Sequence, residues 1–313
     1  MKNNENLTDY DIEIFNLGKN YKIKGKKREI TALKNINLNV KRGEIFGLLG
    51  PNGAGKTTMV SILTTLIQPT DGYAIVLNRN ILTNPRYIKR NIGLMLGADM
   101  IYYRMTGYKN LKFFCKIYGI KDYKQKINNL AERFGLINWL NQLVENYSSG
   151  MKVKIALARV LLTDPKILFL DEPMLGLDPT FVNELINILL KLNKTIFLTS
   201  HQMNVVQKLC DRIAFLKNGE IITVDTRENF MKLLKEKKVR LYVKISSKQD
   251  KFINQLKNLD FISDIKTENE KILITIPNES YYPKLFENLK NFPIIQINEQ
   301  NPTLEDVFIE LSK

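Results

Sequence analysis

Residues 50–57 constrain this chain more than any other stretch, because they read Gly-Pro-Asn-Gly-Ala-Gly-Lys-Thr. The mostly apolar residues 43–49 predict a short buried strand before them, and residues 56–67 predict a helix after them. A glycine-rich turn in this position can aim backbone N–H groups at an anion, and the helix N-terminus adds about half a positive charge. The pattern therefore predicts an α/β fold with a phosphate-binding loop at the end of a buried strand.

Particular side chains of this loop are expected to contact a bound nucleotide and its metal ion. We expect the ammonium of Lys56 to lie against the β- and γ-phosphates and the hydroxyl of Thr57 to bind Mg²⁺. The loop, with the hydroxyl of Thr57 as a ligand, implies Mg²⁺ as the cofactor. Further contacts with the nucleotide are expected from Gly50, Pro51, Asn52, Gly53, Ala54, Gly55 and Thr58.

Two carboxylates follow a second apolar run. Residues 166–173 read Lys-Ile-Leu-Phe-Leu-Asp-Glu-Pro, which predicts a buried parallel strand that ends at Asp171 and Glu172. Open α/β sheets bind ligands at the carboxyl ends of their strands, so we expect both side chains to face the phosphates. Asp171 is placed to bind Mg²⁺. Glu172 is placed to polarise an attacking water as general base, which contributes typically ~10²–10⁴ in rate.

A third strand is predicted at residues 195–200 and ends at His201, the single histidine of the chain. A lone histidine is more often structural than catalytic. This one, however, follows a strand that would deliver it to the same edge of the sheet. We expect it to hydrogen-bond the γ-phosphate and to link that phosphate to Glu172.

Residues 147–152 read Tyr-Ser-Ser-Gly-Met-Lys and open a helical run shortly before the acidic strand. With these motifs in this order, over about residues 10–228, the chain resembles the nucleotide-binding subunit of an ATP-binding-cassette (ABC) transporter. The resemblance implies a P-loop NTPase (RecA-like) core with a helical subdomain at about residues 86–165. The Tyr-Ser-x-Gly-Met-Lys variant is associated with exporter ATPases whose separate membrane permease is of the ABC-2 type.

The resemblance also implies a site shared between two copies. ATP would lie between Lys56 of one chain and the signature motif of a second copy, or of a paralogous ATPase, in a head-to-tail dimer that closes with ATP and opens after hydrolysis. Tyr21 matches the aromatic residue that stacks on adenine. The signature contacts fall on Ser148, Ser149, Gly150 and Met151, and the loop that communicates across the dimer on Gly176, Leu177 and Asp178.

One position departs from the family pattern. Gly97 stands where the family has a glutamine that senses Mg²⁺ and the attacking water. Asp99 or Gln202 could take over that contact, or the site could work without it. The coupling to the membrane subunit through residues 97–106 is therefore left open by the sequence.

The charge balance limits the class of partner. The net charge is +15, and residues 86–165 hold 14 basic and 5 acidic residues, a net charge of +9. This excess of positive charge suits a helical subdomain beside anionic lipid, although lysine is also abundant throughout the chain.

A soluble ABC ATPase that acts on nucleic acid or ribosomes is the alternative function. The chain has one phosphate loop, no zinc-ligand spacing and no heptad run, so we expect no nucleic-acid partner. A regulatory ATP sensor is disfavoured by the presence of both Glu172 and His201.

The remaining sequence features bear on where in the cell the protein is expected. No apolar run reaches the ~18 residues that a membrane span needs, and residues 1–19 lack a secretory signal pattern. Cys115 and Cys210 have no metal-ligand or Cys-x-x-Cys spacing and fall in apolar helical patterns, so buried reduced thiols in a cytosolic protein are expected. The expected place is the cytoplasmic face of the cell membrane, reached through the permease.

We expect the ATPase domain to span residues 1–228, followed by a charged linker at 229–238 and an accessory domain at 239–313. In the accessory domain the pattern predicts strand, helix, strand, strand, helix and strand, the βαββαβ order of a ferredoxin-like α+β fold. Residues 301–311 predict a final amphipathic helix whose sequence resembles the ending of ABC-2 type exporter ATPases. We expect the accessory domain to support the dimer or to regulate it.

Overall fold

The computed structural model describes residues 9–22, 29–97, 100–230, 239–247, 249–268 and 271–300. The chain divides into two compact units, Met1–Arg227 and Glu228–Lys313. Within the described residues, every helix is too short or too polar to cross a lipid bilayer. The predicted amphipathic helix at 301–311 and most of the predicted linker lie outside the described residues.

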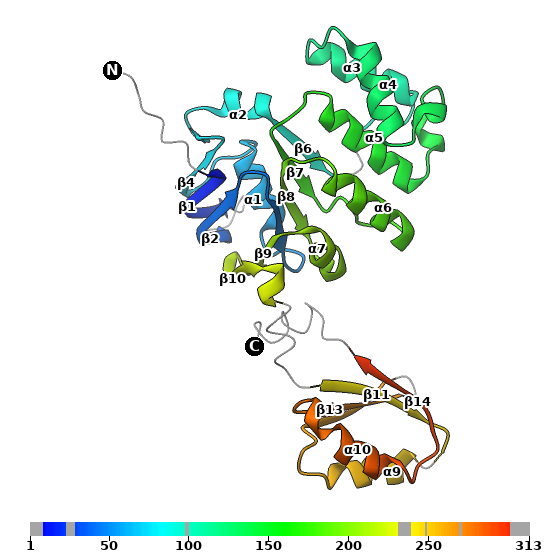
Figure 1. Ribbon diagram of the computed structural model, residues 1–313. Coiled ribbons are helices and arrows are strands. Elements are labelled where there is room, and N and C mark those ends of the chain that lie inside the picture. Colours follow the sequence, from blue (N-terminus) through cyan, green and yellow to red (C-terminus); the bar gives the residue numbers. More distant parts are fainter. Residues whose placement is uncertain are drawn as a thin grey trace. The chain divides into compact units, whose positions relative to one another are not determined.

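A six-stranded sheet forms the centre of the first unit, in the order β10-β9-β3-β8-β7-β6 (Figure 1). All neighbours from β9 to β6 are parallel, and β10 is antiparallel to β9. Strands β3, β7 and β8 are buried along their whole length, as expected for a sheet covered on both faces. The strands are β3 (Ile45–Leu49), β6 (Ile92–Leu96), β7 (Ile167–Asp171), β8 (Thr195–Ser200), β9 (Arg212–Lys217) and β10 (Glu220–Thr226).

A second, antiparallel sheet of four strands packs with the central sheet around one hydrophobic core. Its order is β2-β1-β4-β5. Helix α1 (Lys56–Leu63) contributes Met59, Val60, Ile62 and Leu63 to the same core. The strands are β1 (Tyr10–Lys22), β2 (Glu29–Lys41), β4 (Asp71–Val76) and β5 (Arg79–Asn80).

A helical part lies on the side of the central sheet away from β1 and β2 (Figure 1). It consists of α3 (Gly107–Ile117), α4 (Tyr123–Arg133), α5 (Ser149–Leu161) and the short turns η1 (Ile137–Trp139) and η2 (Val144–Asn146). It is narrower than the predicted range of 86–165, because α2 (Pro85–Asn91) leads directly into β6, which pairs with β7 in the central sheet. Helices α6 (Pro179–Leu190) and α7 (Met203–Leu209) complete the unit.

The second unit has the predicted βαββαβ order and a sheet in the order β12-β13-β11-β14 with antiparallel neighbours. Helices α9 and α10 contribute Phe252, Leu256, Leu285 and Leu289 to a core of their own. The elements are β11 (Val239–Ile245), α9 (Gln249–Lys257), β12 (Asp264–Glu268), β13 (Lys271–Ile276), η3 (Glu279–Tyr281), α10 (Tyr282–Leu289) and β14 (Ile294–Gln300). The predicted ferredoxin-like α+β fold is confirmed.

Candidate functional site

The phosphate loop connects β3 to α1 as predicted. Gly55 caps the helix with a φ of 112°, in the left-handed region, and a Cβ there would lie 2.5 Å from the carbonyl oxygen of Ala32. Glycine is therefore required both by the backbone angle and by the space. No described side chain caps α1, so the N–H groups of its first turn are available to an anion.

Lys56 is 6% exposed and lies within this loop. Its Nζ donates to the carbonyl oxygen of Gly50 at 2.7 Å and to that of Pro51 at 3.1 Å. The same Nζ lies 3.3 Å from Oε1 of Glu172. The ammonium thus joins the loop to the end of β7.

Thr57 and Asp171 meet at the carboxyl edge of the sheet. The Thr57 hydroxyl donates to Oδ2 of Asp171 at 2.7 Å, and Asp171 is 8% exposed. A buried carboxylate and a hydroxyl in contact form a pair of hard oxygen donors, the kind that Mg²⁺ prefers. The two predicted metal ligands are therefore neighbours in space, although 114 residues separate them in sequence.

Glu172 and His201 also meet at this edge. Oε2 of Glu172 lies 2.9 Å from Nδ1 of His201 and 3.4 Å from its backbone nitrogen. Oε1 of Glu172 is buried and, among the described residues, has the ion-pair contact with Lys56 but no partner with hydrogen-bond geometry. One carboxylate oxygen is thus fixed by His201, while the other can still accept a hydrogen bond.

Sequence reasoning missed Thr199, which supports both carboxylates. It is fully buried in β8 opposite Asp171 in the strand register. Its hydroxyl donates to Oδ1 of Asp171 and accepts from the backbone N–H of Glu172 at 3.1 Å. Glu172 has a φ of 49°, a left-handed angle that is uncommon for glutamate, and this hydrogen bond fixes the turn. The available signal was a hydroxyl residue directly after the apolar run 196–198.

The signature motif opens α5. The side chain of Ser148 caps this helix by accepting from the backbone N–H of Met151 at 3.2 Å. Tyr147 anchors the segment, because its hydroxyl donates to the carbonyl oxygen of Trp139 at 2.6 Å, and burial raises the pKa of Tyr147 to about 12. Ser148 and Ser149 are exposed, whereas Gly150 is buried against the ring of Phe181 at the start of α6.

The predicted dimer loop precedes α6. Asp178 caps that helix by accepting from the backbone N–H of Phe181 at 2.9 Å. Since Phe181 also contacts Gly150, the beginnings of α5 and α6 are held together. Gly176 adopts a φ of 74°, and its neighbour Leu175 is 60% exposed.

Tyr21 lies near the end of β1, opposite Ile30 of β2, and is 40% exposed. The ammonium of Lys19 lies 5.3 Å from the centroid of its ring. No contact of the described residues joins Tyr21 to the phosphate loop, so its predicted contact with adenine stays a prediction.

Gly97 follows β6 and donates its backbone N–H to the carbonyl oxygen of Asp171 at 3.3 Å. It therefore lies directly beside the carboxyl edge of the sheet, where β7 ends. Gln202, one candidate for the missing glutamine contact, follows His201 and forms the N-terminal boundary of α7. Asp99, the other candidate, lies outside the described residues.

The loop, the buried lysine and the two carboxylates at the end of the parallel strand β7 define a P-loop nucleoside triphosphatase. Two family descriptions match the chain: "ABC transporter" over residues 33–175, and "ATP-binding protein DrrA1-3-like, C-terminal domain" over residues 226–312.

Relatives match over most of the chain. The linearmycin resistance ATP-binding protein LnrL of Bacillus subtilis (strain 168) is 30% identical over 299 residues, which is 92% of this chain and 94% of LnrL. The bacitracin transport ATP-binding protein BcrA of Bacillus licheniformis is 32% identical over 289 residues, 90% of this chain and 92% of BcrA. The ATP-binding cassette MJ0796, solved as a dimer in a post-hydrolysis state with ADP and Pi, is 27% identical with a TM-score of 0.63, over 69% of this chain and 98% of that one.

The chain belongs to the family of ABC transporter ATP-binding proteins. It is the ATP-binding and ATP-hydrolysing subunit of such a transporter, and its second unit is a DrrA-like C-terminal domain. The predicted family, fold class and enzymatic activity are confirmed.

Proposed function

We propose that this protein drives export through a separate membrane permease of the ABC-2 type, from the cytoplasmic face of the cell membrane. The relatives named for linearmycin resistance and bacitracin transport match nearly the whole chain, including the C-terminal domain, and they support export. The observation that carries the ATPase role is the meeting of Lys56, Glu172 and His201 at one edge of the sheet. The transported molecule is set by the permease and is left open.

We further propose Thr57 and Asp171 as the protein ligands of Mg²⁺. The described residues hold no group of three or more His, Cys, Asp or Glu side chains that could bind a metal. A pair of protein oxygens is nonetheless what Mg²⁺ uses when substrate phosphates supply other ligands, so the donor set fits. When bound, the ion would neutralise charge on the phosphates.

In the proposed mechanism, Glu172 acts as general base. His201 holds Oε2, which leaves Oε1 to accept a proton from the attacking water. Lys56 exchanges its contacts with the Gly50 and Pro51 carbonyls for contacts with the β- and γ-phosphates. Because Lys56 also faces Glu172, this exchange frees the carboxylate from its ion pair.

We propose that each ATP is sandwiched between two chains. Ser148 and Ser149 are exposed at the N-terminus of the 13-residue helix α5, where backbone N–H groups and the helix dipole favour an anion. The contact between Gly150 and Phe181 ties that helix to the loop of Gly176, Leu177 and Asp178. The second copy is the same chain or a paralogous ATPase. The dimeric form of MJ0796 supports this arrangement.

The experiment that tests this function is a comparison of Glu172→Gln with the wild type. We expect the variant to bind Mg-ATP, to hydrolyse it ~10²-fold or more slowly, and to accumulate as a dimer in gel filtration only when ATP is present. Asp178→Asn, at the end of the dimer loop, should weaken the dimer without loss of ATP binding. Wild-type hydrolysis by Glu172→Gln, or a monomer with trapped ATP, would contradict the proposal.

Export itself is tested with the complete complex. Co-expression with a candidate ABC-2 type permease, followed by ATPase and transport measurements in proteoliposomes, should give transport with the wild type and none with Glu172→Gln. We also propose that the region 239–313 supports the dimer or regulates it, joined to the ATPase domain of residues 1–228 by a linker at 229–238. Loss of this region should then change the ATP dependence of dimerisation.

A further inference from the structure

Helices α5 and α6 lie beside each other and are joined by contacts on two successive turns (Figure 1). In the first turn of each helix, a Cβ added at Gly150 would lie 2.6 Å from the ring of Phe181. One turn further along, Nζ of Lys154 lies 2.7 Å from Oε1 of Glu184. Residues three or four apart share one face of a helix, so each helix presents both of its contact residues to the other. The two helices therefore run in the same direction from adjacent N-termini.

Lys154 is the charged residue at the centre of this contact. It is buried, with 8% of its surface exposed, whereas the side chain of Glu184 is 51% exposed. Nζ of Lys154 also lies 5.1 Å from the centroid of the Phe181 ring, within the range of a cation–π contact. A partly buried ion pair adds little net stability, because both charges lose water. What this pair holds in place therefore matters more than its energy.

Phe181 links the signature motif to the dimer loop. Its ring packs on Gly150 of the signature motif, and its backbone N–H donates to Oδ1 of Asp178 at 2.9 Å. Asp178 is the last residue of the dimer loop and the N-cap of α6. The position of Phe181 thus sets the position of this loop relative to the exposed Ser148 at the start of α5. Lys154 contacts both Phe181 and the next turn of α6, so it fixes this spacing.

We propose that Lys154 is a positioning residue for the ATP site formed between two chains. This role rests on the proposed sandwich of ATP, in which the signature motif and the dimer loop of one chain meet the second chain together. Lys154 keeps the two at a fixed spacing, so that the second chain can contact both at once. Loss of the ammonium should weaken the closed dimer. It should leave the binding of ATP to a single chain unchanged, because the phosphate loop of that chain holds this ATP.

The test uses the full chain in the Glu172→Gln background, in which the ATP-bound dimer is expected to accumulate. Lys154→Met keeps the length and the apolar stem of the side chain but removes the charge. Lys154→Arg keeps the charge and can still pair with Glu184. Glu184→Gln removes the same ion pair from its exposed side, so this variant is expected to fold even if Lys154→Met does not.

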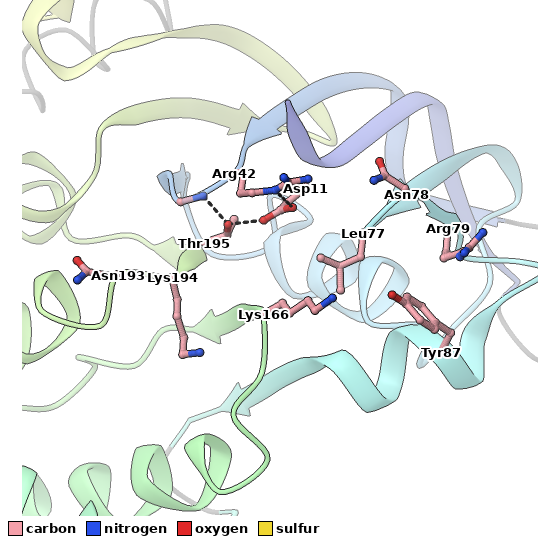
Figure 2. A pocket seen from close by; sticks show the side chains of 11 residues that line it. Asp11, Arg42, Leu77, Asn78, Arg79, Tyr87, Lys166, Asn193, Lys194 and Thr195 are labelled. Atoms are coloured by element: carbon pink, nitrogen blue, oxygen red, sulfur yellow. Dashed lines mark hydrogen bonds and ion pairs between the residues drawn. The ribbon is translucent and has the colours of Figure 1, made fainter. Parts of the chain in front are cut away.

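The matched control is Lys194→Met. Nζ of Lys194 lies 2.8 Å from Oδ1 of Asp164, so this ion pair is nearly as short as the one formed by Lys154. Lys194 lines a pocket at the amino-terminal edge of the central sheet, next to Thr195 at the start of β8 (Figure 2). The pair joins the segments that follow α5 and α6. It is therefore roughly 20 Å from their N-termini, which is the length of a 13-residue helix.

Two quantities are measured for each variant. Analytical ultracentrifugation with saturating Mg-ATP gives the dissociation constant of the dimer. Titration with a fluorescent ATP analogue, at a protein concentration too low for the dimer, gives the ATP affinity of the single chain. We expect Lys154→Met and Glu184→Gln to weaken the dimer about tenfold and to change the ATP affinity less than about twofold. The two changes together should weaken the dimer no more than Lys154→Met alone, because both remove one contact.

Lys154→Arg and Lys194→Met should form the dimer within about threefold of the Glu172→Gln background. A dimer of unchanged strength in Lys154→Met and Glu184→Gln would overturn the positioning role while leaving the sandwich intact. Equal losses of ATP affinity and of dimer strength would also overturn it, because they would show general damage to the fold. If the Glu172→Gln chain with Lys154 intact forms no dimer with ATP, the sandwich itself is wrong, and the role of Lys154 with it.

Discussion

Nδ1 of His201 lies 2.9 Å from Oε2 of Glu172, and this contact joins the ends of strands β7 and β8. The ring is 35% exposed, so its far side can still meet a ligand. The carboxylate is held at one oxygen by His201 and faces Lys56 with the other. His201 therefore orients the proposed base, and its predicted contact with the γ-phosphate would use the exposed side of the ring.

The first prediction follows from this contact. His201→Ala should lower the ATPase rate by ~10²-fold or more while the affinity for Mg-ATP changes less than about threefold, because the base loses its orientation and the phosphate loses one of several contacts. Phosphate release and calorimetric titration measure the two quantities. His201→Gln, which keeps a hydrogen-bond donor, should retain more activity than His201→Ala. Equal rates for wild type and His201→Ala would show that the contact is structural only.

The second prediction concerns Lys56. Lys56→Ala should abolish ATP binding or hydrolysis, since no other ammonium in the loop can replace this one and Lys56 is buried where the phosphates are expected. Lys152→Ala, which removes a lysine that contacts the ring of Tyr103, serves as the control and should still bind ATP within one chain. Isothermal titration with Mg-ATP and a phosphate-release assay measure the two quantities. Wild-type affinity together with a wild-type rate of hydrolysis in Lys56→Ala would contradict the assignment of the loop.

The third prediction concerns the buried hydroxyl of Thr199. Thr199→Val keeps the shape of the side chain but leaves Oδ1 of Asp171 without this donor, and an unsatisfied buried group costs about 1–3 kcal/mol. We expect ATP hydrolysis about tenfold slower and a lower free energy of unfolding. Thr199→Ser restores the hydroxyl and should rescue the rate. Thr199→Ser as slow as Thr199→Val would instead point to packing of the lost methyl group.

Much of the site was predictable because its residues stand at the ends of strands. The runs 45–49, 167–170 and 196–198 are apolar, so the burial and the carboxyl ends of these strands could be inferred. The meeting of Lys56, Asp171, Glu172 and His201 could be inferred with them. In the C-terminal domain, strand patterns and helix patterns alternate and are separated by clear turns. The βαββαβ order could therefore also be predicted.

Other features of the structure depend on contacts between residues that are far apart in the sequence. No local sequence pattern indicates such contacts. Thr199 reads as one more strand residue, and only the register of β7 against β8 places its hydroxyl beside Asp171. The helical part was predicted to begin too early, because α2 and β6 look like a continuous basic and apolar stretch until β6 pairs with β7. A pocket lined by Arg42, Arg79 and Lys166, among others, brings together three segments that are far apart in the sequence, and no local pattern indicates that they meet.

The last prediction concerns Gly97, the position at which the resemblance to the family implies a glutamine. Among the described residues, apart from the chain neighbours, no atom lies within 4 Å of a Cβ at this position. The φ of 69°, however, lies in the left-handed region. The cost of a side chain there is therefore in the backbone, roughly 1–2 kcal/mol for a residue without tolerance for this region. Gly97→Gln should shift the backbone N–H that contacts the Asp171 carbonyl oxygen.

We accordingly expect Gly97→Gln to hydrolyse ATP but to lose transport in proteoliposomes, since the loop that leads away from the catalytic edge would change its path. Gly97→Asn is the matched control, because asparagine has a polar carboxamide of similar chemistry and tolerates left-handed angles, so it should keep transport close to that of the wild type. ATPase rate and transport are measured side by side for the three proteins. If Gly97→Gln hydrolyses ATP faster and transports normally, the restored carboxamide matters more than the backbone, and the glycine is not needed for its conformation.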